Sequence, residues 1–302
     1  MNVFSKKYTA IFLVLFLTLG ATCQERSSGA KDLQIKSGKK KKKRKVKLPD
    51  IDLSHWKVTI PEGKGKGGAL SISPPEILDY GNNEALKPFM FNDSVSGALV
   101  FLAYPTNATT ANTKYSRTEL REQMEPGNDN VNWTFAQGGI LTAKMAMEEV
   151  SRTDDGTSHK VIVAQIHGRL TDEQRKLIGQ KDNNAPPMLK IYWHNGKIRV
   201  KTKVLKYAGV NQVGILQKEA WTDDNGKTFE QDVGFMKFTI EVKVTEGKMV
   251  VSLNKNEFFV YDNPSIKRWG VFENYFKVGN YFQSRDAGSF AKVKLYELHV
   301  EH

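Results

Sequence analysis

Three short segments of the sequence carry, at every second position, side chains that bind carboxylates or move protons. In chain order these side chains are Arg117, Glu119 and Arg121, then Gln165 and His167, then Tyr275, Lys277, Tyr281 and Gln283. A spacing of two places such residues on one face of an extended strand. Surface strands mostly use Lys, Glu and Thr, whereas Arg, Gln, His and Tyr pair with carboxylates or transfer protons. A concave sheet face lined by them would form a groove for an anionic chain.

The residues between these side chains are apolar and give each strand a second face. Ala164 and Ile166 alternate with the polar pair of the second segment, and Phe276, Val278 and Phe282 do the same in the third. We therefore expect strands whose apolar backs pack into a core and whose polar fronts are open. Taken singly, each polar front could also be an ordinary solvent face with cross-strand ion pairs.

The elements that must position these segments are predicted to be strands throughout the domain. Runs of alternating apolar and polar residues, broken by Gly, Asn, Asp and Pro, occur at 56–60, 98–104, 140–147, 160–167, 189–193, 198–204, 235–244, 249–253, 258–261 and 293–300. Asn195-Gly196 and Glu246-Gly247 predict tight hairpin turns, and Thr171 predicts the N-cap of one short helix. The fold class we expect is all-β, an antiparallel β-sandwich or jelly roll.

The net charge of +12 on 302 residues is concentrated at the N-terminus. The first 47 residues carry 13 Lys and Arg against two acids, so the remainder is almost neutral. The basic character therefore gives no reason to expect a nucleic-acid partner for the folded part.

The N-terminal residues have the charged, apolar and small-residue order of a secretory signal. We expect a signal peptide at residues 1–23, a basic disordered linker at 24–47 and one catalytic domain at 48–302. The apolar run is too short to span a bilayer. The protein is expected to be exported, either secreted or held at the cell surface or outer membrane as a lipoprotein. Lipid attachment at Cys23, the only membrane contact that we expect, and simple cleavage are both compatible with the sequence.

The three segments resemble the signature motifs of the alginate lyases of polysaccharide lyase family 7. The matching residues are Arg117–Arg121, Gln165–His167 and Tyr275–Gln283, in this order, and the resemblance extends from about Trp56 to Val300. Val278 departs from the family pattern, which usually has Ala there. The resemblance implies a β-jelly roll with a concave substrate-binding sheet. It also implies cleavage of alginate by β-elimination, in which the C5 proton is removed and the oxygen on C4 is expelled.

The resemblance assigns roles to four of these residues. Arg117 and Gln165 would neutralise the uronate carboxylate, so that the enolate-like intermediate is stabilised. His167 would be the base, and Tyr281 the acid that protonates the leaving oxygen. Five further residues are expected to bind substrate or to position the others: Arg121, Glu119, Lys277, Tyr275 and Gln283.

Some expectations concern the surroundings of these residues. Glu119 is predicted to lie between Arg117 and Arg121 and to orient them. The loops 105–114 and 168–187 border the motif strands and could fold over the groove. No spacing of His, Asp or Glu indicates a metal site, so we expect no metal and no cofactor. The expected partner is alginate, an anionic polysaccharide, and the expected oligomeric state is a monomer.

Substrate preference and the rival functions follow from the same residues. In guluronate the C5 proton and the C4 oxygen lie on opposite faces, which requires two groups; in mannuronate Tyr281 could serve as both base and acid. The Ile166 of Gln-Ile-His favours guluronate-containing substrate within the family. The alternatives are a non-catalytic polyuronate-binding module, a lyase of another polyuronate, and a glycoside hydrolase. A glycoside hydrolase would need two carboxylates, one on each side of the cleaved glycosidic bond, and the three polar fronts offer only Glu119.

Overall fold

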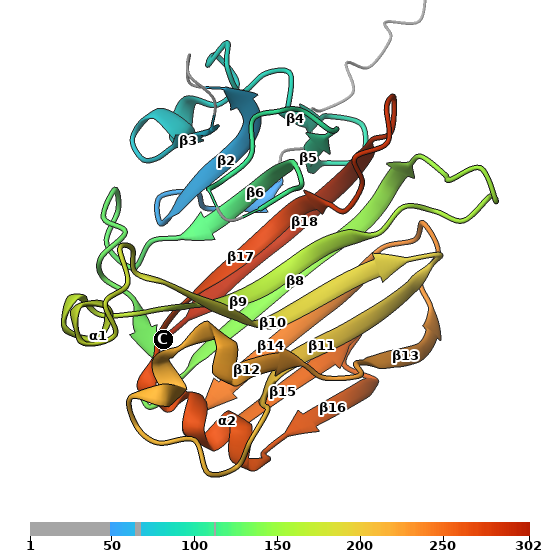
Figure 1. Ribbon diagram of the computed structural model, residues 1–302. Helices are drawn as coiled ribbons and strands as arrows, with labels where there is room; N and C mark the ends of the chain where they lie inside the picture. The colour runs from blue at the N-terminus through green and yellow to red at the C-terminus, as the bar shows by residue number, and fades with distance from the viewer. Residues whose placement is uncertain (1–48, 64–67, 112) are drawn as a thin grey trace, which may run out of the picture. The chain divides into compact units, whose positions relative to one another are not determined.

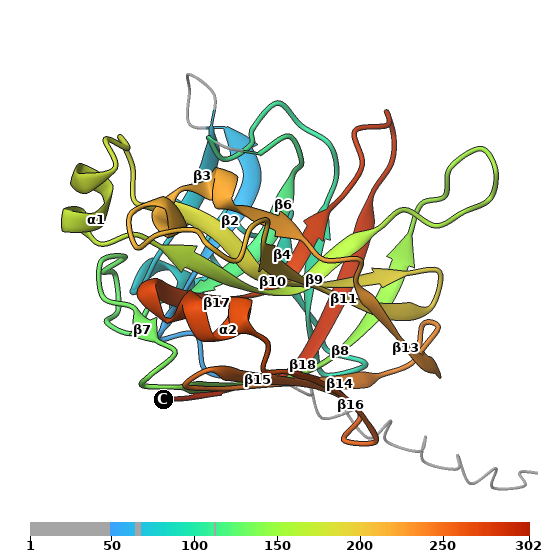
Figure 2. The same cartoon turned by 60° about the horizontal axis from the view of Figure 1, so that its bottom comes forward.

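The computed structural model describes residues 49–63, 68–111 and 113–302. The expected signal peptide and basic linker, with Cys23, lie outside these residues. The described part is an all-β sandwich of two antiparallel-rich sheets, as the strand pattern predicts. Figure 1 shows the strands, and Figure 2 shows β14, β15 and β16 lying below β9, β10 and β11 as two layers.

The first sheet has eight strands. Its order is β16 (Glu257–Tyr261), β15 (Lys248–Leu253), β14 (Phe238–Thr245), β8 (Gly139–Val150), β18 (Ala291–Glu301), β5 (Ala98–Ala103) and β4 (Met90–Asp93), with β1 (Asp50–Ile51) paired in parallel to β18.

The second sheet has ten strands and carries the three polar segments. Its order is β12 (Trp221–Asp223), β11 (Lys197–Leu205), β10 (Asn184–His194), β9 (Val161–Arg169), β17 (Glu273–Phe282), β6 (Arg117–Glu122), β2 (Trp56–Gly63) and β3 (Ala69–Ile72), with β13 (Lys227–Asp232) paired to β11 and β7 (Trp133–Thr134) paired to β17.

Helices are short and lie in the connections between strands. They are α1 (Asp172–Leu177), α2 (Pro264–Arg268) and the 3₁₀ turns Glu76–Asp79, Gly214–Leu216, Lys218–Ala220 and Trp269–Val271. The capping box predicted at Thr171 is present, because its side chain accepts from the Gln174 backbone N–H while Gln174 bonds back.

The core lies between the two sheets and is built from the apolar backs of the strands. Ile166, Phe276, Val278 and Phe282 are all fully buried there, so the predicted alternation is confirmed. Val278 therefore faces the core and not the groove.

The turns follow from local sequence. Asn195 and Gly196 have φ of 49° and 79°, as a two-residue turn between β10 and β11 requires. At the second predicted turn only Gly247 has positive φ. The run predicted from residue 235 begins as a strand only at Phe238. Six short strands were not predicted: β1, β3, β4, β7, β12 and β13. Of these, β1, β7 and β12 have only two or three residues, too few to show an alternation.

Candidate active site

The three polar segments are neighbours in one sheet, with β17 lying between β6 and β9 (Figure 1). Lys277 pairs with Arg121 on one side and with Gln165 on the other. On the same two strands, Tyr281 pairs with Arg117 and Tyr275 with His167. The period-two spacing in three distant segments therefore creates one continuous polar surface.

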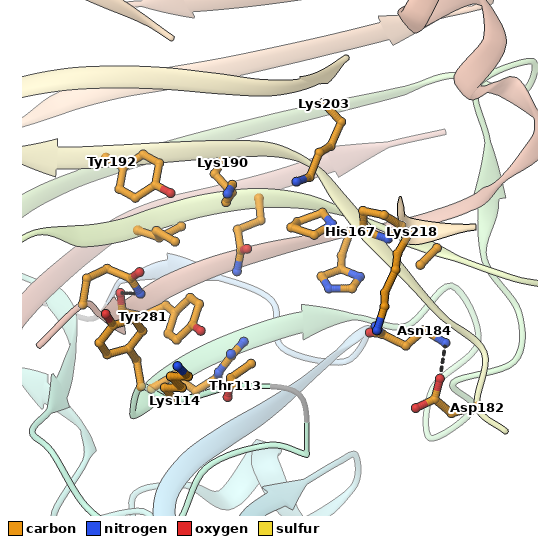
Figure 3. A pocket seen from close by; sticks show the side chains of 18 of the residues that line it. Thr113, Lys114, His167, Asp182, Asn184, Lys190, Tyr192, Lys203, Lys218 and Tyr281 are labelled. Carbon is orange, nitrogen blue, oxygen red and sulfur yellow. Dashed lines mark hydrogen bonds between the residues drawn. The ribbon is translucent and has the colours of Figure 1, made fainter. Parts of the chain in front are cut away.

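A groove of about 750 Å³ lies over this surface (Figure 3). Of the nine predicted site residues, five line it: Arg117, Gln165, His167, Tyr281 and Gln283. The other four, Glu119, Lys277, Arg121 and Tyr275, lie below or beside the lining. Both loops expected to border the site contribute residues, Thr113 and Lys114 from one and residues 180–182 and 184–187 from the other.

Glu119 is the centre of a buried network beneath the groove. Its carboxylate accepts from Arg117 Nη1 at 2.8 Å, from Gln165 Nε2 at 2.5 Å and from Lys277 Nζ at 2.5 Å. Burial alone would raise the pKa of Glu119, but Lys277 and then Arg117 hold it below its ordinary value. Burial, reinforced by Arg117, lowers the pKa of Lys277 to about 8. At neutral pH the three charged groups sum to +1.

The predicted contact between Glu119 and Arg121 is not formed. Arg121 instead donates from Nη1 to Asp129 Oδ1 at 2.8 Å and from Nη2 to Asn132 Oδ1 at 2.9 Å. Its guanidinium lies 4.1 Å from the ring centre of Tyr275. Lys277 occupies the place beside Glu119 that the sequence-based expectation gave to Arg121.

Gly279 makes this arrangement possible. It lies opposite Glu119 in the register and has φ of +141°. A Cβ there would lie 2.8 Å from the Thr118 carbonyl oxygen and 3.1 Å from the Glu119 Cα. β17 therefore approaches β6 so closely at this position that only glycine fits. Between Val278 and Tyr281 the register of β17 against β9 also shifts.

His167 has the geometry of a neutral base. Its Nδ1 is 2.9 Å from the Gly168 carbonyl oxygen, which can only accept, so Nδ1 carries the proton. Nε2 then has a lone pair, and none of the described residues hydrogen-bonds to it. Burial and then Lys277 lower the pKa of His167 to about 3, which keeps the ring neutral at physiological pH. The ring stacks on Tyr275 with centres 5.3 Å apart.

Tyr281 is a protonated phenol beside a cation. Burial raises its pKa, and Arg117 only partly offsets that effect. The Arg117 guanidinium lies 3.7 Å from the ring centre, and Tyr115 meets the ring edge-on at 6.4 Å. Tyr281 therefore has a proton to give at neutral pH.

Arg117 keeps donor capacity for a ligand. One N–H group is used on Glu119, while Nε is buried and has no hydrogen-bond partner among the described residues. Because Nε has almost no access to solvent, a ligand in the groove would be met by the remaining Nη groups of Arg117, which lines the groove.

Sequence reasoning missed the lysines that line the rest of the groove. Lys190 on β10 and Lys203 on β11 both pair with Asp223 of β12, at 2.6 and 2.7 Å. Figure 3 places them across the groove from Thr113 and Lys114. Lys181 and Lys218 line it as well. The sequence did contain a sign that Lys190 lies on the groove face, because it alternates with buried residues on β10. Lysine is, however, also the ordinary residue of a solvent-exposed face.

The titratable groups gathered here are cations and a base rather than metal ligands. Within residues 49–63, 68–111 and 113–302, no three His, Cys, Asp or Glu side chains are grouped so that they could hold a metal ion. Over the same ranges, no helix is both long and apolar enough to cross a membrane. What the groove offers chemically is carboxylate binding together with a proton acceptor and a proton donor.

Comparison with known proteins relates this chain to alginate lyases. The profile of the family described as "Alginate lyase" matches residues 51–302. An alginate lyase of Klebsiella pneumoniae is 24% identical over 290 residues, covering 83% of this chain and 90% of its own length. The chain belongs to the alginate lyases of polysaccharide lyase family 7.

Solved structures agree with this assignment. Alginate lyase A1-II', a member of family 7, is 30% identical with a TM-score of 0.64, covering 83% of this chain and 95% of its own. Alginate lyase PA1167 from Pseudomonas aeruginosa, 22% identical with a TM-score of 0.61, covers 83% of this chain and all of its own, and it supports the fold.

Proposed function

We propose that this alginate lyase cleaves the 1,4-glycosidic bond by β-elimination, with Arg117, Gln165, His167 and Tyr281 in direct contact with the reacting uronate. The observation that carries the proposal is that Arg117, whose guanidinium is only partly used by Glu119, lines the same groove as the neutral His167. A uronate carboxylate held by Arg117 places the weakly acidic C5 proton within reach of His167.

Charge neutralisation is the first requirement, because C5 is a very weak acid next to a carboxylate. Arg117 has guanidinium N–H groups besides the one used on Glu119, and Gln165 likewise has a second N–H. Lys277 adds positive charge from below through Glu119. Donors fixed by a buried network stabilise developing charge without reorganisation, which is how an enolate-like intermediate is made accessible.

Proton transfer is the second requirement. Nε2 of His167 takes the C5 proton, since Nδ1 is fixed as a donor to Gly168. Tyr281, which stays protonated because burial raises its pKa, gives its proton to the O4 leaving group. The product carries a C4–C5 double bond at its new non-reducing end.

We propose a preference for guluronate-containing alginate on the protonation states of these two groups. Opposite-face elimination needs a neutral base and a protonated acid, and His167 and Tyr281 are in these states. Same-face elimination by Tyr281 alone would need a phenolate, which the raised pKa disfavours. A1-II' has been solved with substrate (GGMG) and with product (GGG) in variants with a tyrosine-to-phenylalanine substitution. Ile166 is buried, so it does not contact substrate.

We also propose that the protein is exported, on the order of charged, apolar and small residues in positions 1–23. Mass analysis of the mature N-terminus would distinguish lipid attachment at Cys23 from simple cleavage, and an unprocessed N-terminus would contradict export.

Mass spectrometry of the products tests the elimination. Each cleavage by elimination yields an unsaturated fragment that lacks the water that hydrolysis would add. Fragments carrying that water, or no fragments from any alginate, would contradict the proposal.

A further inference from the structure

The catalytic groove does not end at Tyr281. A second hollow of about 490 Å³ shares Tyr115 and Gln283 with it. The backbone N–H of Gln283 donates to the Lys160 carbonyl oxygen at 2.9 Å, so the second hollow lies where β17 leaves the sheet and β9 enters it. The two hollows are one continuous surface.

Two cations of this second hollow are unused within the protein. Lys160 and Arg285 are both exposed, and neither side chain has an ion-pair or hydrogen-bond partner in the part of the chain that the structure describes. By contrast, the nearby acids are engaged. Asp155 accepts from the Thr157 backbone at 3.0 Å, and Asp286 pairs with the buried His159 at 2.8 Å.

The loop that carries Arg285 is braced. The Asp286 backbone N–H donates to Ser284 Oγ at 3.0 Å, and Ser289 Oγ donates to the Asp286 carbonyl oxygen at 2.7 Å. With the His159 pair, these bonds hold the loop at both ends. Arg285 is thus presented from a fixed backbone, which lowers the entropy lost when its side chain binds a ligand.

Lys160 is also distant from the base. It directly precedes β9 and lies seven residues from His167, which at strand spacing is roughly 20 Å. A uronate at the cleavage position cannot contact both residues. Only a chain of several sugar units can extend from the groove over Gln283 to the second hollow.

We propose that Lys160 and Arg285 form a second carboxylate-binding site, which holds uronate units of the same chain beyond the bond that is cleaved. The inference rests on the proposed function and extends it, because it makes the enzyme favour long chains. His194 lines the same hollow as Lys160.

The test compares the double variant Lys160→Ala/Arg285→Ala with the wild type on polymeric alginate and on short oligosaccharides that fill only the catalytic groove. We expect KM for the polymer to rise about three- to tenfold, since each exposed ionic contact is weak. The kcat on the polymer and the kcat/KM on short substrates should stay unchanged. Both side chains are exposed, so the variant is expected to fold.

The matched control is Lys243→Ala/Lys248→Ala, which removes the same charge from exposed positions of the other sheet. It should leave KM for the polymer unchanged. An unchanged KM in the Lys160/Arg285 variant, an equal loss on short substrates, or the same rise in the control would each overturn the proposal. If the wild type instead released no unsaturated product from any substrate, the proposed function itself would fail, and the two failures are therefore distinguishable.

Discussion

Gln165 donates from Nε2 to Oε1 of Glu119 at 2.5 Å. Because an ionised carboxylate can only accept, this contact fixes which end of the amide is nitrogen and turns the amide oxygen away from Glu119. The second N–H of Gln165 is then left for a substrate carboxylate. Glu119 also holds Arg117 and Lys277, so one buried acid sets the orientation of three groups on three strands.

Replacing Glu119 by Gln should therefore destabilise the protein strongly. Arg117 and Lys277 would remain buried without a counter-charge, which typically costs about 3–5 kcal/mol of the free energy of unfolding. Urea denaturation measures this. Glu149→Gln, which breaks the exposed pair with Lys292, is the matched control and should cost less than about 1 kcal/mol. Equal, small effects in both variants would contradict the role of Glu119.

Removing the base or the acid should lower kcat while the fold persists. We expect His167→Ala and Tyr281→Phe each to reduce kcat by about 10²- to 10⁴-fold, as loss of general acid–base catalysis does. Tyr281→Phe keeps the ring under Arg117 and deletes only the hydroxyl group. Tyr115→Phe, on the neighbouring ring, is the control and should keep kcat within a few-fold. Full activity in either catalytic variant would remove its assigned role.

The pH dependence of kcat/KM reports on the free enzyme. His167 must be neutral, and its pKa is lowered to about 3, so activity should be lost only far below neutrality. Lys277 must be protonated, and its pKa is about 8, so kcat/KM should fall as the pH rises through that value. A profile that is flat between about pH 5 and 7 is the expected result. A tenfold loss with a midpoint near the ordinary histidine pKa of about 6.5 would argue against this environment of His167.

The C-terminal residue should make stability depend on pH. His302 Nε2 lies 2.6 Å from Glu122 Oε1, and Nδ1 lies 3.0 Å from the Gly138 carbonyl oxygen. Both nitrogens face acceptors, so the ring is a cation. Burial opposes this charge, but Glu122 outweighs burial and raises the pKa of His302.

Because that pKa is raised, the stabilisation is complete below about pH 6.5, the unfolded value, and is lost as the pH rises through the folded value. His302→Gln should cost about 3 kcal/mol of unfolding free energy at pH 6 and much less at pH 9. Denaturation curves at the two pH values measure this difference. A cost that is the same at both would show that the pair does not carry the charge.

The sequence predicted the parts of the site that depend on strand periodicity. Alternation placed His167 and Gln165 on one face and Ile166 on the other, and the sheet preserves that parity. The partner of Arg121 was not predictable in this way, since Asp129 lies on a loop whose path depends on tertiary contacts. Which residue reaches Glu119 also depends on the cross-strand register, which sets Gly279 opposite Glu119 and Lys277 two positions away, and alternation does not reveal that register.

The lysines of the groove were missed for a different reason. Lys190 and Lys203 have the residue type and exposure pattern of an ordinary solvent face, and only the pairing of β10, β11 and β12 brings them around Asp223. Lys160 and Arg285 line the same hollow because β9 and β17 are neighbours, although 125 positions separate them in the sequence. Long-range strand pairing, rather than local pattern, assembles these parts of the site.

The most direct test is ultraviolet absorbance over time, with polyguluronate and polymannuronate supplied separately and with a chelator control. Elimination creates a double bond conjugated to the carboxylate, and hydrolysis does not. We expect absorbance to rise on both polymers, faster on polyguluronate and equally with chelator. A faster rise on polymannuronate would contradict the proposed preference, and no rise on either polymer would contradict the assignment of His167 and Tyr281 as a working base and acid.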